Sequence, residues 1–325
     1  MKEGDCLNVE ITIQNGADIQ MPVVKDGIKL TWERKGTPGR LTFTVYKSDG
    51  LNFQEGNPVK LLVDGAAIFS GFVFQKKRDK NRSIDVVAYD QLRYLKNKDT
   101  VIDEGLKASD LLKRLASDFR LEIGKIADTG YVVETIVEEN QTLFDIIQKT
   151  LDETMMHTKQ LFILYDDVGK LTLQNVNTMK LDILIDEETG ENFNYETSID
   201  SQTYNKINLA YPNKDTGTLE RFVVQDGENI NRWGVLQYFE QIQTTTGAVQ
   251  KAEALLKLYD MKTRKLSIQK VFGDVRVRAG SAVAVSLHLG DMVANQYMMV
   301  DKVTHIFESE RHTMDLNLIG GAFIA

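Results

Sequence analysis

Apolar and polar residues alternate through the first 95 positions in a series of short runs, most of which are bounded by Gly, Pro, Asp or Asn. A period of two places every second side chain on the same face, so each run predicts a β-strand with one buried and one solvated face. Strands in this number are enough for a small antiparallel barrel or sandwich. The runs are residues 7–13, 28–32, 41–45, 59–63, 68–74 and 84–89.

The stretch from Glu55 to Lys76 predicts a β-hairpin. Two apolar runs flank the dipeptide Asp64-Gly65, which favours the tight turn of a two-residue hairpin because both residues tolerate positive φ. The basic run that follows, residues 76–82, is a predicted turn between two strands. We interpret it as a solvated hairpin tip, with a surface for an acidic partner as the alternative.

The pattern around Gly56 recurs around Gly280. Each glycine is followed three, five and seven residues later by an aliphatic residue, and then by two further strand-like runs. A leucine precedes each glycine, Leu41 by fifteen positions and Leu266 by fourteen. We interpret the two stretches as copies of one antiparallel β unit. The alternative is a chance resemblance between two ordinary hairpins.

Between these two β units the period of the apolar positions changes from two to 3.6, which predicts helices. One helix is expected around residues 109–119 and a second after Asn140, at residues 143–151. The intervening runs predict strands, so the segment reads as a compact α+β insertion. The predicted strands of this insertion are residues 131–137, 161–165 and 171–173.

The second half of the chain returns to strand patterns after the acidic, polar stretch 186–194, which we interpret as a linker. Strands are predicted at residues 207–211, ended by Pro212, and at residues 219–224. A helix is predicted from Gly247 to Tyr259, with Thr245 or Thr246 as its N-cap. The expected class is therefore α+β and mainly β. Its expected domains are residues 1–95, 96–185 and 186–325, with an inserted helix at about 247–260.

Composition narrows the classes of function. The chain has 325 residues and a formal net charge of −8, which disfavours nonspecific attraction to DNA or to anionic membranes. Cys6 is the only cysteine, so neither an intrachain disulfide nor a Cys-rich zinc site can form. No run approaches the ~18 apolar residues of a membrane span, and the N-terminus lacks the apolar core of a signal peptide. We expect folding in a cytoplasm.

Motifs for chemistry are absent from the sequence: there is no Gly-x-Ser-x-Gly, no phosphate-binding glycine loop and no His-Glu-x-x-His. The four histidines, His157, His288, His305 and His312, share no spacing. His305 and His312 flank a predicted hairpin turn and could approach each other, but two histidines without a third ligand make a poor zinc site. We expect structural or surface roles for all four.

Paired carboxylates were considered as candidates for glycoside hydrolysis, which needs two of them about 5–9 Å apart across a cleft. The candidate pairs are Glu138-Glu139, Asp166-Asp167 and Glu187-Glu188. All three fall in predicted turns or linkers, where acidic residues are common. We therefore assign no catalytic, cofactor-binding or metal-binding residue and expect no enzymatic activity and no cofactor.

Five stretches, taken in their order and spacing, resemble the XkdQ/YqbQ-type baseplate hub proteins of contractile phage tails and phage-tail-like bacteriocins. More distantly they resemble the late control protein D of temperate phages. Each stretch alone is ordinary strand and turn chemistry, but together they cover the whole chain at a matching length. The stretches are Pro38–Val45, Glu55–Val59, Ile68–Phe74, Tyr89–Asn97 and Thr203–Ile207.

This resemblance implies two tube-like antiparallel β-barrel domains related by duplication, with the α+β insertion between them. It implies a homotrimer whose pseudo-sixfold ring adapts a sixfold tail tube to a threefold spike. The implied partners are the tail tube or tube-initiator protein, the central spike or tip protein and baseplate wedge proteins. DNA would pass through a lumen expected to be negative, with no membrane insertion. The expected location is the baseplate of a virion tail, a prophage-encoded tail or a tailocin, assembled in the bacterial host cytoplasm.

Two other classes of function stay open on the sequence. One is a tail-associated cell-wall or carbohydrate-binding or hydrolytic protein, which would need a concave site with exposed aromatic residues or paired carboxylates. The other is a β-rich scaffold of a non-phage secretion machine with the same hub architecture. The resemblance implies no catalytic residues, so the structural role is the first hypothesis.

Overall fold

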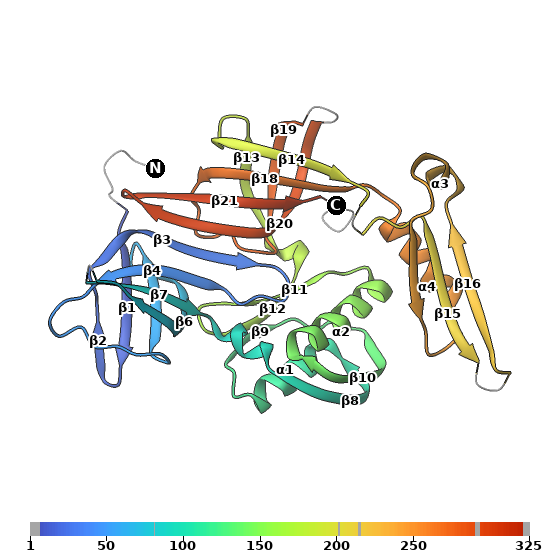
Figure 1. The fold of residues 1–325 in the computed structure, drawn as a ribbon, viewed down its shortest axis with the longest axis horizontal. Coiled ribbons are helices and arrows are strands. Elements are labelled where there is room, and N and C mark those ends of the chain that lie inside the picture. Colours follow the sequence, from blue (N-terminus) through green and yellow to red (C-terminus); the bar gives the residue numbers. More distant parts are fainter. Residues whose placement is uncertain (1–6, 81, 201, 214–215, 290–292, 321–325) are drawn as a thin grey trace. The chain divides into compact units, whose positions relative to one another are not determined.

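The computed structural model describes residues 7–80, 82–200, 202–213, 216–289 and 293–320 (Figure 1). The first residues of the chain, Cys6 among them, lie outside this part. The chain divides into two compact units, of which one runs to Asn194 and resumes at Leu266, and the other is Tyr195–Lys265. The expected domain boundaries at residues 95 and 185 stay a prediction.

Six strands of the first unit form an array in the order β3–β4–β7–β6–β5–β1, in which every neighbouring pair is antiparallel. Their alternating apolar residues form one buried face, as the period of two predicts. A short strand, β2 (Asp18–Gln20), pairs with the outer edge of β1. The six strands are β1 (Val9–Asn15), β3 (Val24–Glu33), β4 (Arg40–Tyr46), β5 (Pro58–Val63), β6 (Ala66–Arg78) and β7 (Ser83–Tyr89).

The predicted hairpin is confirmed as β5 and β6, with Val63 opposite Ala66. Asp64 and Gly65 have φ of 49° and 78°. Positive φ at both central residues is the signature of the hairpin turn that an Asp-Gly dipeptide favours.

A second array has the order β14–β18–β21–β20–β19–β13. Position by position it repeats the order of the first array, with β20 in the place of β6. One pairing differs in direction: β13 is parallel to β19, whereas β1 is antiparallel to β5. The strands are β13 (Lys180–Asp186), β14 (Asn192–Ser198), β18 (Thr263–Phe272), β19 (Ala282–His288), β20 (Val293–Glu308) and β21 (Arg311–Ile319).

The two arrays are joined by an antiparallel pairing of β20 with β3, which makes them one 13-stranded sheet (Figure 1). The register places Lys302 opposite Glu33 and Thr304 opposite Thr31. The fold is thus mainly β with antiparallel sheets, and that part of the expected class is confirmed. The stretch 186–194, expected to be a linker, instead forms a short turn and the first residues of β14, because the turn closes on hydrogen bonds within itself.

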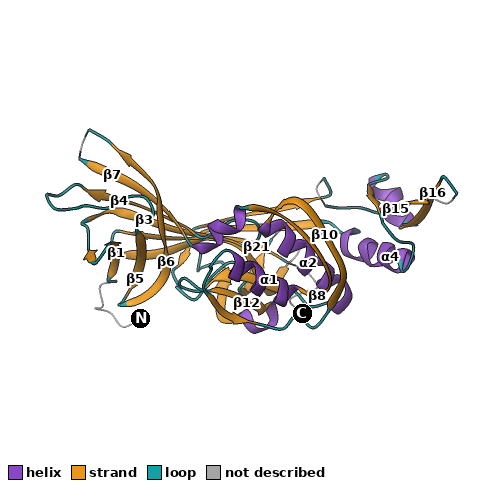
Figure 2. Ribbon diagram, turned by 90° about the horizontal axis from the view of Figure 1, so that it is seen from below, coloured by secondary structure: helices purple, strands orange, loops and turns teal. Residues whose placement is uncertain are grey.

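The predicted insertion contains both predicted helices, α1 (Ala108–Asp118) and α2 (Leu143–Thr158), which lie beside the ribbon of β8 and β10 (Figure 2). Thr142 caps α2 by accepting a hydrogen bond from Asp145 N. The apolar faces of both helices form one buried cluster with residues of the neighbouring strands. The other elements are η1 (Gln91–Lys96), β8 (Lys98–Lys107), β9 (Ile123–Ile126), β10 (Val132–Thr142), β11 (Phe162–Asp166), β12 (Leu171–Asn175) and η2 (Val176–Met179).

The second unit is a three-stranded sheet with β15 in the centre, antiparallel to β16 and parallel to β17. The predicted last helix is confirmed as α4, but its N-cap is Gly247 in a left-handed conformation, so the prediction of Thr245 or Thr246 was wrong. Pro212 does not end its strand. β17 pairs with β15 only as far as Ala210, so no partner strand on that edge needs the backbone N–H that proline lacks. The elements are β15 (Lys206–Asn213), β16 (Thr218–Gln225), α3 (Gly227–Trp233), β17 (Gln237–Gln241) and α4 (Ala248–Tyr259).

Candidate functional site

The two glycines singled out in the sequence hold equivalent places. Gly56 N donates to Val73 O at 2.7 Å, and Gly280 N donates to Val300 O at 2.8 Å. Their φ angles are 87° and 91°, a region that favours glycine. In both β6 and β20 the pairing register shifts at the residue after this valine. The two arrays therefore share a bulge and the glycine contact beside it, as well as a strand order.

Strand edges distinguish the two ends of this sheet. The first half of β20 pairs with β19, and its second half pairs on the same side with β3. In β6 the first half pairs with β5 in the same way. Within the described residues, however, no strand continues this edge of β6 along its second half, residues 74–78. In the same part of the chain, β14 pairs only with β18. Such edges can pair with a strand of another chain.

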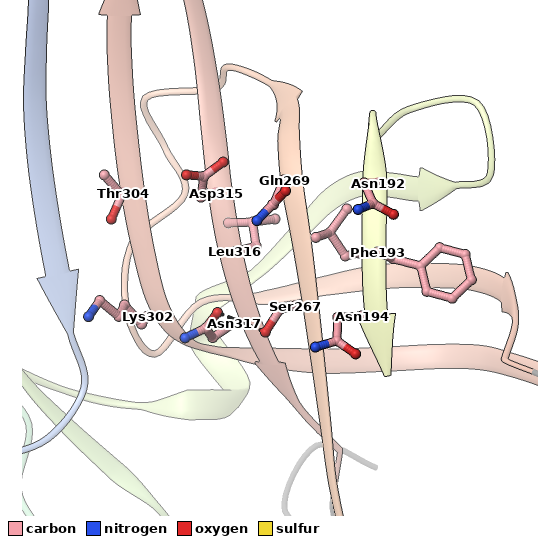
Figure 3. Close-up of a pocket in the computed structure, with 11 residues that line it drawn as sticks. Asn192, Phe193, Asn194, Ser267, Gln269, Lys302, Thr304, Asp315, Leu316 and Asn317 are labelled. Atoms are coloured by element: carbon pink, nitrogen blue, oxygen red, sulfur yellow. Dashed lines mark hydrogen bonds between the residues drawn. The ribbon is translucent and has the colours of Figure 1, made fainter. Parts of the chain in front are cut away.

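A polar hollow of about 370 Å³ lies on β14, β18, β20 and β21 (Figure 3). Asn192 and Asn194 reach it from β14, and the Ser267 hydroxyl donates a hydrogen bond to Asn317 Oδ1 at 3.1 Å. Amides and hydroxyls outnumber the charged side chains of the lining, so the hollow offers hydrogen bonds rather than a reactive group. Its lining residues are Asn192, Phe193, Asn194, Ser267, Ile268, Gln269, Lys302, Thr304, Asp315, Leu316 and Asn317.

The predicted approach of His305 and His312 is confirmed, with Nδ1 of His305 2.8 Å from Nε2 of His312. Nε2 of His305 lies 2.9 Å from the carbonyl oxygen of Val277, which can only accept, so this nitrogen carries the proton. His312 therefore donates to His305. Burial lowers the pKa of His305 to about 3 and that of His312 to about 4, so both are neutral at pH 7.

A buried acidic cluster at Asp90 and Asp166 was missed by the sequence reasoning. Asp90 Oδ2 accepts from Gly39 N at 2.8 Å, and its Oδ1 accepts from Leu92 N, which caps η1. Burial, and then the nearby Asp166, raise the pKa of Asp90. Burial also raises the pKa of Asp166 to about 6. An Asp directly before a short helical turn was the one available signal, and it indicates an N-cap, not a second buried carboxyl group nearby.

Arg278, between β18 and β19, contacts β3 of the first array and β11 of the insertion beside this cluster. Its guanidinium lies over the rings of Trp32 and Tyr165, at 5.1 and 4.1 Å from their centroids. It also donates to the backbone oxygen of Asp166 at 3.0 Å and lies 3.6 Å from the Asp167 carboxylate. A cation stacked on two rings and held by backbone contacts favours a rigid structural role.

The remaining candidate residues are not brought together. His157 stacks on Tyr131 with ring centroids 4.3 Å apart, and the exposed His288 contacts Glu187 at 2.8 Å. Glu138 forms an ion pair with Lys149. Within the described ranges no group of three His, Cys, Asp or Glu side chains is arranged to hold a metal ion. No helix in the same ranges has the length and apolar character to cross a bilayer.

The sequence matches the family model described as YQBQ-like over residues 28–319, which is most of the chain. The chain belongs to the YQBQ-like family. The phage-like element PBSX protein XkdQ of Bacillus subtilis (strain 168) is 28% identical to it over 312 residues, which cover 92% of this chain and 93% of XkdQ. The resemblance found in the sequence is thereby confirmed.

Solved structures show the same fold at low sequence identity. The 43 kDa tail protein of prophage MuSo2 from Shewanella oneidensis matches with a TM-score of 0.72 and 12% identity, over 95% of this chain and 98% of that one. The E. coli c3393 protein matches with a TM-score of 0.58 and 9% identity, over 97% and 80%. It is described as a type VI secretion system component with structural similarity to T4 bacteriophage tail proteins gp27 and gp5. This YQBQ-like chain therefore has the fold of phage tail proteins.

Proposed function

We propose that this YQBQ-like protein is the structural baseplate hub of a contractile tail or tail-like particle. Three copies form a ring in which each chain contributes two tube-like barrel walls, so that six similar walls surround one axis. Such a ring offers approximate sixfold symmetry to the tail tube and true threefold symmetry to a trimeric spike. The observation that supports this most is the strand order that recurs in the two arrays.

The joint between the arrays supports the same proposal. Pairing of β20 with β3 makes the two arrays neighbours in one continuous wall within a single chain. A closed ring of such walls removes the exposed strand edges that would otherwise cause aggregation. We take the two arrays to be products of a duplication that adapts three chains to a sixfold partner.

The polar face of the joined strands would line the passage of this ring. Charges there are compensated where the arrays meet: Lys302 lies 3.5 Å from Glu33, and the hydroxyls of Thr31 and Thr304 are 3.1 Å apart. A negative lumen stays a prediction. The expected partners are the tube or its initiator at one face, a spike at the other, and wedge proteins outside.

The test is the stoichiometry of purified tail particles. Native mass measurement or quantitative gel analysis should give three copies of this chain for each trimeric spike, that is, three per tail end. A different ratio would contradict the proposal. Purified cell wall incubated with the protein should release no sugar fragments. Release of fragments would favour a hydrolytic tail protein instead.

A further inference from the structure

Within one chain, β20 pairs with β3 and so joins the two arrays. Two further strand edges, at the second half of β6 and at β14, have no partner strand among the described residues. On the basis of the proposed ring, we propose that residues 74–78 of β6 pair antiparallel with β14 of a second copy of this chain. The pairing would repeat between chains the joint that β20 and β3 form within one chain.

The second half of β6 has the same local geometry as the second half of β20, which does pair with a strand of the other array. Val73 in β6 and Val300 in β20 hold equivalent places, because each accepts a hydrogen bond from its glycine and precedes a bulge. Counting four residues onward from each valine, Lys77 takes the place of Thr304. In β20 that position faces β3, opposite Thr31. In β6 it is exposed; it pairs with Asp85 of β7 on one side, and among the described residues no strand lies on its other side.

The place of β14 follows from its pairing with β18. The Thr263 hydroxyl donates to Ser198 O at 3.0 Å and Arg264 Nε donates to Tyr195 Oη at 3.1 Å, so the two strands run antiparallel, and Asn194 lies beside Ser267 (Figure 3). We take these two residues to be opposite each other; the bond from Glu191 N to Gln269 O, just before β14 begins, lies one residue out of this register. Both residues reach the same polar hollow, as opposite residues must (Figure 3). Ser267 follows a fully buried leucine, as Thr42 does in β4.

The equivalence fixes the register. Thr42 pairs with Lys29 in the first array, so Asn194 takes the place of Lys29 in the second. Two residues onward, Glu196 takes the place of Thr31. A joint between two copies built like the internal one therefore sets Lys77 of one chain opposite Glu196 of the next.

Charge supports the choice of a second copy as the partner. The exposed end of β6 carries Lys76, Lys77 and Arg78, whereas the exposed β14 strand carries Glu196. Opposite charges facing each other across a strand pair are stabilising, and like charges are destabilising. Each chain offers one edge of each kind, so the contact runs head to tail and closes into a ring at a fixed number of copies.

The experiment uses tail particles assembled in cells that make the full-length hub with Cys6→Ser, Lys77→Cys and Glu196→Cys. After mild oxidation, a non-reducing gel should show covalent dimers and trimers of the hub and nothing larger. The matched control carries Cys6→Ser, Thr31→Cys and Thr304→Cys, which places the two cysteines at the internal joint. That variant should stay at the mobility of a monomer. Each single cysteine of the Lys77 and Glu196 pair should also give no covalent oligomer.

Particles that contain three copies of the hub per trimeric spike but yield only monomers on the gel would overturn this pairing and leave the proposed function intact. A stoichiometry other than three would instead contradict the proposed function.

If the hub with the cysteine pair is not incorporated into tail particles, charge reversal tests the same contact between Lys77 and Glu196. Lys77→Glu should lower incorporation into particles about tenfold, because it sets two like charges opposite each other at every contact. Lys77→Glu combined with Glu196→Lys should restore incorporation. Normal incorporation of Lys77→Glu alone would overturn the inference, as would a failure of the double reversal to rescue a defective Lys77→Glu.

Discussion

The two strand arrays share one order of pairing but end differently, since β1 is antiparallel to β5 whereas β13 is parallel to β19. The chain enters the first array from the N-terminus and enters the second from the insertion, through η2. Hairpins connect β5, β6 and β7 directly, and likewise β19, β20 and β21, which keeps the order of these strands the same in both arrays. The last strand is reached by a longer connection, so its direction can vary while its place in the sheet stays the same.

The largest expected effect comes from the cores of the two arrays. Leu61 in β5 and Val285 in β19 hold equivalent buried places. Leu61→Ala should lower the free energy of unfolding by about 3 kcal/mol, because it removes buried carbons and leaves a cavity. Val285→Ala removes fewer carbons and should cost about 2 kcal/mol. Urea unfolding of the two variants measures both; a negligible cost for either would show that its array is not packed as described.

Substitution of the equivalent glycines, Gly56 and Gly280, should give a smaller difference in stability between the two arrays. Gly56→Ala and Gly280→Ala both force a residue with a Cβ into positive φ, at a cost of about 1 kcal/mol. At Gly280 the new Cβ would also lie 2.5 Å from Ile163, whereas at Gly56 it would meet open space. Gly280→Ala should therefore be the less stable variant in thermal unfolding. Ile163→Ala removes the two γ carbons that the new Cβ would meet, so it should cost less stability in the Gly280→Ala background than in the parent chain; equal stability of the two alanine variants would contradict the packing.

Lowering the pH should destabilise the second array because His305, which is buried and neutral, resists protonation in the folded state. His305 has a folded pKa of about 3 and an unfolded pKa of about 6.5, so the unfolded chain binds more protons between these values. Its contribution to stability is complete above pH 6.5 and is lost as the pH falls toward 3. A neutral His305→Gln variant should have a smaller dependence of unfolding free energy on pH across this window. An unchanged slope would show that the histidine pair does not stay neutral.

The acidic cluster should respond in the opposite direction and by less. Asp166 has a folded pKa of about 6 against an unfolded value of about 3.9, so its carboxyl group favours the folded state below pH 3.9. That contribution is lost as the pH rises through 6. Between pH 4 and 6 this loss opposes the gain that comes from His305, so Asp166→Asn should make the rise of unfolding free energy with pH steeper in that range. A flatter rise in the variant would contradict this sign.

Local patterns predicted the hairpin at Asp64-Gly65, the three longer helices and the echo of Gly56 at Gly280. Weakly apolar elements were missed: α3 has no buried residue, and β14 is exposed along most of its length, so neither shows a clear period. The cap of α4 was wrong because Gly247 occupies the position before the helix.

Pairings between strands far apart in the sequence could not be predicted either. β13 and β19 are about a hundred residues apart, and local periodicity contains no information on which strands meet. The approach of His305 and His312 could be predicted because a hairpin of short span connects them. Asp90 and Asp166 are brought together only by the packing of the insertion on the first array, so no spacing in the sequence indicates their contact.

The most direct test of the central claim is a side-chain-resolution map of the assembled baseplate. The account requires three copies of this chain around one axis, six similar strand arrays in the wall, and alternating β20–β3 joints within chains and β6–β14 joints between them. A map in which each chain contributes only one array to the wall would contradict the account.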